Sequence, residues 1–202
     1  MGLQLEQLSF SQMEMPLFTW GGGLVVRSRL ENRVTWNRPR LVEDTAFVWK
    51  AALQEEASYG VSNIYVRNQA PPSVQALLQQ RRRWAGGNHM ESEKLSQPYR
   101  SFIRIRNYAW GLTPITAIAI PLLIGFAPAS VMGEEALGVI GLVTTGIIPL
   151  WYLLGILYYP DRDWKMIPGI PVLPFAALLH SLGAIWGIVS PPASFTVTPK
   201  KE

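Results

Sequence analysis

The chain has 202 residues, with 18 Lys and Arg against 14 Asp and Glu, and its lack of cysteine excludes disulfides and thiolate metal sites. Fourteen of the basic residues lie between Arg27 and Arg106, whereas the apolar segment from Tyr108 to Ser190 carries only Arg162 and Lys165. A basic half beside an apolar half is typical of proteins that meet lipid headgroups or phosphorylated substrates. No nucleic-acid-binding motif is present, so we expect no nucleic-acid partner.

The N-terminal residues predict short elements around a glycine-rich turn. Met1 to Met15 is amphipathic and lacks the basic start and apolar core of a signal peptide, which predicts a short helix. Leu17 to Trp20 is an apolar, strand-like run. The glycines at 21–23 that follow it suit either a plain turn or a close backbone approach by a ligand.

An acidic pair, Glu43 and Asp44, opens a predicted helix that runs from Thr45 to Ala57. Acidic residues at a helix start usually serve the cap and the helix dipole. The functional alternative makes Asp44 a general base that deprotonates a hydroxyl nucleophile. The sequence leaves both interpretations open.

The next predicted elements are a strand, Asn63 to Asn68, and a helix from Val74 through Trp84 that Ser73 caps and the glycines at 86–87 end. Within this helix, Gln80-x-x-Arg83-Trp84 combines an amide, a guanidinium and an indole. An arginine fork fits phosphate oxygens, and a tryptophan face suits a sugar ring. The alternative is a stop-transfer cluster of basic residues with an interfacial tryptophan.

The second half predicts membrane segments. Lys94 to Asn107 predicts an interfacial amphipathic segment, and residues 108–127 and 138–159 are apolar and long enough to cross a bilayer as helices. The flanking basic residues place the N-terminal half in the cytoplasm. Three prolines interrupt the third apolar stretch, so its helix, Phe175 to Ser190, is only about 24 Å long. We favour an interfacial or re-entrant helix here over a third crossing, which keeps the C-terminus cytoplasmic.

Taken together, these residues resemble the membrane-bound family 2 glycosyltransferases, the group of cellulose, chitin and hyaluronan synthases. Val42-Glu43-Asp44 matches the family's acidic-Asp motif, which is T-E-D or a variant of it. Gln80-x-x-Arg83-Trp84 matches its Q-x-x-R-W motif, and Phe195 to Lys200 is similar to its F-x-V-T-x-K gating loop. The resemblance covers the chain from Trp20 onward.

The resemblance implies an inverting attack by a glycan or lipid hydroxyl on the anomeric carbon of a nucleotide sugar. It implies that Asp44 is the base, with Glu43 beside it at the substrate. It further implies that the acceptor end and the donor pyrophosphate contact Gln80, Arg83 and Trp84. The residues that would close over the nucleotide are Phe195, Thr198 and Lys200.

One departure from the family concerns the donor. The family's catalytic domain begins with a βαβ half whose D-x-D motif holds Mg²⁺ or Mn²⁺. The only D-x-D here, Asp161-Arg162-Asp163, lies in a short loop that we interpret as a membrane edge. We therefore expect no metal or other cofactor in this chain, although the complete enzyme would use Mg or Mn. We expect the start to be truncated or misplaced, or a separate chain to supply that half.

The predicted fold is α-rich α/β. Residues 1–107 would form the C-terminal, acceptor side of a GT-A-type domain. Residues 108–202 would form a membrane region with two spans, an interfacial helix at 175–190 and a tail at 195–200. The alternative function is a non-catalytic small membrane protein whose arginine-rich helix binds anionic lipid or a partner subunit. That alternative would require the arginines at 81–83 to act collectively, with no role for Asp44.

Overall fold

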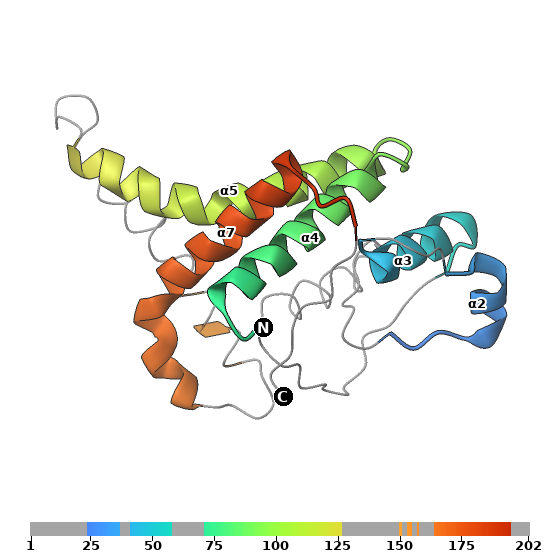
Figure 1. Ribbon diagram of the computed structural model, residues 1–202, viewed down its shortest axis with the longest axis horizontal. Helices are drawn as coiled ribbons and strands as arrows, with labels where there is room; N and C mark the ends of the chain where they lie inside the picture. The colour runs from blue at the N-terminus through green and yellow to red at the C-terminus, as the bar shows by residue number, and fades with distance from the viewer. Residues whose placement is uncertain are drawn as a thin grey trace.

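The computed structural model describes residues 24–36, 41–57, 71–126, 150, 153–154, 157 and 164–194 (Figure 1). Their elements are α2 (Ser28–Val34), α3 (Glu43–Gln54), α4 (Val74–Ser92), α5 (Tyr99–Phe126), the 3-10 helix η1 (Trp164–Val172) and α7 (Leu173–Val189). These ranges contain no strand, and their helices agree with the α-rich part of the prediction. The predicted helix at 1–15, the strands at 17–20 and 63–68 and the glycine turn at 21–23 lie outside the described residues.

Helices α4, α5 and α7 pack against one another, with α7 lying along both of the others (Figure 1). The contact between α4 and α7 depends on Gly183 and Gly187, which are one turn apart on α7. A Cβ added at Gly183 would lie 2.8 Å from the Arg81 Cβ, and one added at Gly187 would collide with the Arg82 carbonyl. Small residues spaced four apart allow two helix backbones to approach closely. Because Gly183 and Gly187 have no side chain, α4 and α7 can cross at this short distance.

The predicted end of α4 at residues 86–87 is wrong, because the helix continues through both glycines to Ser92. A Cβ at Gly86 would lie 2.7 Å from the Gly187 carbonyl oxygen, and one at Gly87 would lie 2.9 Å from the Leu41 Cβ. Each glycine costs about 1 kcal/mol of helix propensity relative to alanine. Here the two glycines allow close packing on two sides of α4 instead of ending it.

The interior of this three-helix unit is made of small and polar residues. Along α5, the buried positions Ile103, Asn107 and Gly111 recur every fourth residue. The buried Ser181 hydroxyl of α7 donates to the Gly111 carbonyl. Asn107 is fully buried, and neither atom of its amide has a hydrogen-bond partner among the described residues. The unit is thus held by close backbone approach more than by large apolar side chains.

Helix α3 packs against a different partner on each of two faces, in both cases through apolar side chains. One face buries Phe47, Val48 and Ala51 with Val34 of α2. The other buries Trp49 with two residues that flank the start of α5, Leu95 and Ile103. Burying such side chains stabilises the fold by about 1.5–3 kcal/mol each. These contacts hold α3 against α2 on one face and against the start of α5 on the other.

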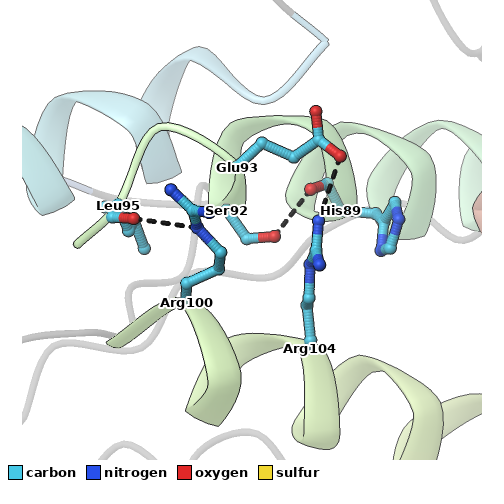
Figure 2. A network of polar contacts seen from close by, with 6 residues as sticks. All are labelled: His89, Ser92, Glu93, Leu95, Arg100 and Arg104. Carbon is cyan, nitrogen blue, oxygen red and sulfur yellow. Dashed lines mark hydrogen bonds and ion pairs between the residues drawn. The ribbon is translucent and has the colours of Figure 1, made fainter. Parts of the chain in front are cut away.

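Polar contacts orient the reversal between α4 and α5 (Figure 2). The Ser92 hydroxyl donates to the His89 carbonyl at 2.6 Å, and the Arg100 Nε donates to the Leu95 carbonyl at 3.0 Å. Across the turn, the Arg104 Nη2 lies 3.0 Å from the Glu93 Oε1. The first bond satisfies a carbonyl in the last turn of α4, where no intrahelical donor is left, and the second satisfies a carbonyl in the turn that follows.

The predicted membrane segments are represented only in part. Helix α5 includes residues 108–126 of the first predicted span, and it joins them without a break to the predicted interfacial segment from Tyr99 onward. Most of the second predicted span, residues 138–159, lies outside the described residues. None of the helices in the described ranges combines the length and apolarity that a membrane crossing requires. The helix predicted at 175–190 is confirmed as α7, and two of the three prolines before it lie in η1.

Candidate functional site

The residues that precede α3 contact the middle of α4. The Arg83 Nη1 donates to the Leu41 carbonyl at 2.7 Å. One turn further along α4, Gly87 packs against the side chains of Leu41 and Val42. Because Glu43 and Asp44 follow Val42 directly, this contact brings the guanidinium of α4 close to the acidic start of α3.

The electrostatics of Arg83 show this proximity. Burial lowers the pKa of Arg83, while the charges of Glu43 and then Asp44 act in the opposite direction. A partly buried guanidinium is disfavoured unless negative groups lie nearby, and this one has two. The structure therefore brings together three of the residues that the sequence singled out.

Asp44 sits half-buried in the first turn of α3. Its Oδ1 accepts a hydrogen bond of 2.8 Å from the Thr45 backbone N–H, one of the helix-start donors that lack an intrahelical acceptor. No other donor to this carboxylate is found among the described residues. The helix-start role considered from the sequence is thus present, and it uses one of the two carboxylate oxygens.

Gln80, Arg83 and Trp84 share one face of α4, because residues three and four apart on a helix are neighbours. All three are half-buried. The Arg81 guanidinium lies over the Trp84 ring, 4.4 Å from the ring centroid. A sugar ring would consequently have to stack on the opposite face of this indole.

The three consecutive arginines of α4 have different neighbours. Arg82 donates from its Nε to the Ser190 carbonyl at 2.8 Å and from its Nη2 to the Ser190 Oγ at 3.1 Å. It also lies over the Trp186 ring, 4.2 Å from the centroid. Arg82 therefore satisfies a carbonyl at the C-terminus of α7, where a positive charge is also favoured.

This division disagrees with a single lipid-binding cluster at residues 81–83, since each guanidinium faces a different part of the fold. Sequence reasoning missed the contact between Arg82 and Ser190. No local signal could have revealed it, because the two residues are 108 positions apart.

Other predicted site residues lie outside the described residues: the glycines at 21–23, the D-x-D at 161–163, and Phe195, Thr198 and Lys200. Their roles remain predictions. Within the part of the chain that the structure describes, no group of three or more His, Asp or Glu side chains could hold a metal ion.

The model of a family described as glycosyl transferase family group 2 matches residues 4–188. Neither the search of curated proteins nor the search of solved structures found a match.

Proposed function

Since the chain belongs to glycosyl transferase family group 2, we propose that the place where the residues leading into α3 contact α4 is the acceptor side of an inverting sugar-transfer site. Membership in the family makes the chemistry glycosyl transfer, with a nucleotide-sugar donor and an acceptor. The observation that supports this location is the hydrogen bond from Arg83 to the Leu41 carbonyl, which brings the guanidinium close enough for the charges of Glu43 and Asp44 to raise its pKa against the effect of burial. Arg83 is 39 positions from Asp44 and 40 from Glu43 in the sequence, and the fold brings it close to both.

In this proposal Asp44 is the general base. As its Oδ1 already accepts from Thr45, the other oxygen would take the proton from the acceptor hydroxyl. The hydroxyl oxygen then forms a bond to the anomeric carbon, and the bond from that carbon to the diphosphate oxygen breaks. Inversion follows, because the nucleophile enters on the face opposite the leaving nucleoside diphosphate.

In this proposal three side chains of α4, Gln80, Arg83 and Trp84, stabilise and orient the reactants. The diphosphate gains negative charge as it leaves, and Arg83 is suited to bind its oxygens. Trp84 would stack against the acceptor sugar, with Gln80 one turn away as a hydrogen-bonding group. The predicted tail residues, Phe195, Thr198 and Lys200, remain part of the proposal as contacts to the nucleotide.

In this proposal the metal ion that accompanies the donor is bound outside the described residues. The described residues contain no ligand set for Mg or Mn, so no step above runs through a metal ion. We propose that a donor-binding half with a D-x-D motif, which the family resemblance implies, holds the donor and its metal. When bound there, the metal would offset charge on the leaving diphosphate.

We further propose a membrane-bound synthase-like enzyme whose site faces the cytoplasm. The order of the three sequence motifs supports the subtype. Large apolar side chains exposed on α5 and α7 support contact with lipid, among them Ile105 at 68% exposure, Phe175 at 69% and Val189 at 78%.

The test is Asp44→Asn, compared with Glu56→Gln as a matched control. Both changes remove one negative charge, and Glu56 lies exposed just beyond the other end of α3. The assay measures sugar transfer in membranes in which the chain is co-expressed with the donor-binding half. We expect Asp44→Asn to reduce transfer by about 100-fold or more, the usual contribution of a general base, and Glu56→Gln to leave it unchanged. Equal transfer by the two variants would remove Asp44 from the mechanism.

A further inference from the structure

Gly87 is the position of α4 against which the residues before α3 pack most closely. It is buried, and a Cβ added there would lie 2.9 Å from the Leu41 Cβ and from the Val42 Cγ1, and 3.0 Å from the Val42 Cγ2. Ordinary contacts begin at 3.4 Å. The Leu41 Cβ is bonded directly to its backbone, so no rotation of a side chain moves it away. A side chain at position 87 would therefore push the chain before α3 away from α4.

Val42 connects this contact to the first turn of α3. It precedes the helix directly, it is only 4% exposed, and its carbonyl accepts a hydrogen bond of 3.0 Å from the Ala46 N–H. Two residues later, the Asp44 Oδ1 accepts from the Thr45 N–H within the same turn. A displacement of Val42 is thus passed directly to the turn that carries the proposed base.

The rest of α3 is held by other parts of the fold. Phe47, Val48 and Ala51 are buried with α2. Trp49 is buried with residues that flank the start of α5. Because neither cluster includes a residue of α4, a side chain added at position 87 would displace the first turn of α3 more than the remainder of the helix.

We propose that Gly87 is a positioning residue of the transfer site, because its lack of a side chain lets the first turn of α3, with Asp44, lie close to Arg83. Arg83 is one turn before Gly87 on the same face of α4, and its Nη1 donates to the Leu41 carbonyl at 2.7 Å. Both contacts hold the same short segment of chain against α4. Gly87 itself contacts no reactant, and the inference rests on the proposed function, in which Asp44 is the base.

The first comparison is Gly87→Ala against Gly86→Ala, in the membrane assay described for Asp44→Asn. Transfer is expressed per folded protein, measured by gel filtration in a neutral detergent. The control adds the same methyl group at the next position of α4, where it would lie 2.7 Å from the Gly187 carbonyl oxygen and so disturb the contact with α7 instead. A misplacement of about 1 Å can cost about 100-fold in rate, and the overlap at position 87 is about half of that distance. We therefore expect Gly87→Ala to lower kcat by about tenfold and Gly86→Ala to keep the wild-type kcat.

The second comparison repeats Gly87→Ala in the Asp44→Asn background. If Gly87 acts through Asp44, the added methyl group should cost nothing further once the base is gone, because residues that act as a unit are not additive. A general loosening of the fold would lower transfer by the same factor in both backgrounds.

The third comparison is a rescue. Val42→Ala removes two of the three atoms that the new Cβ would meet, so Gly87→Ala/Val42→Ala should transfer faster than Gly87→Ala. The Leu41 Cβ remains in the way, so the double variant should still transfer more slowly than Val42→Ala alone. This last pair carries the test if Gly87→Ala does not fold.

The positioning role is supported by a defect in Gly87→Ala that disappears in the Asp44→Asn background. It is overturned if Gly87→Ala transfers as fast as Gly86→Ala, or if its defect is the same with and without Asp44. A defective Asp44→Asn beside a fully active Gly87→Ala would overturn this inference alone. A fully active Asp44→Asn would overturn the proposed function as well.

Discussion

Replacing Gly187 by alanine tests the close crossing of α4 and α7. The new Cβ would lie 2.9 Å from both the Cα and the carbonyl carbon of Arg82, and closer still to the carbonyl oxygen. Ordinary contacts begin at 3.4 Å, and all three atoms belong to the backbone, so no side-chain rotation relieves the collision. Helices α4 and α7 must therefore separate, which also loosens the neighbouring contacts at Gly86 and Gly183.

Such overpacking costs about 1–3 kcal/mol, and occasionally more. Alanine returns at most about 1 kcal/mol of helix propensity, so we expect Gly187→Ala to lower the free energy of unfolding by about 2 kcal/mol. The assay is urea denaturation followed by circular dichroism. The control is Gly111→Ala on α5, whose Cβ would lie 3.1 Å from a side-chain atom of Ile185 that can move. We expect that control to stay within about 0.5 kcal/mol of the wild type. Equal stability of the two variants would refute the crossing described above.

Three further predictions concern other contacts of the same unit. Arg82→Gln should lower the free energy of unfolding, measured by urea denaturation, by about 1–2 kcal/mol. The variant loses the hydrogen bonds to Ser190 and the stacking on Trp186. An unchanged free energy of unfolding would show that α7 does not need this contact. Asn107→Leu should raise the free energy of unfolding by about 1–3 kcal/mol, since it replaces a buried amide that has no hydrogen-bond partner in the described part of the chain. A loss of stability would mean that the amide is satisfied. Burial, and then the charge of Arg81, lower the pKa of His180 from the usual 6.5 to about 4, so protonation favours unfolding. Stability should therefore be complete above pH 6.5 and fall as the pH drops toward 4, and Tm measured against pH should show less of this fall in His180→Gln.

The sequence by itself determined the local elements and the grouping of the site residues on each of them. Ser73 was predicted to cap α4, and its Oγ accepts from the Ala76 N–H at 3.1 Å. The spacing of Gln80, Arg83 and Trp84 places them on one face of any α-helix, whatever surrounds it. Such features depend on neighbours within one turn of the chain, which the sequence states directly.

Only the tertiary structure decided what each of these groups faces. The glycines at 86–87 predicted a helix end from their low propensity, yet they lie inside α4 because Leu41 and Gly187 approach it there. Three adjacent arginines looked equivalent in sequence, but Arg82 binds Ser190 while Arg83 faces the start of α3. These outcomes depend on backbones that meet across dozens of residues, and a helix gains more from that packing than it loses in propensity.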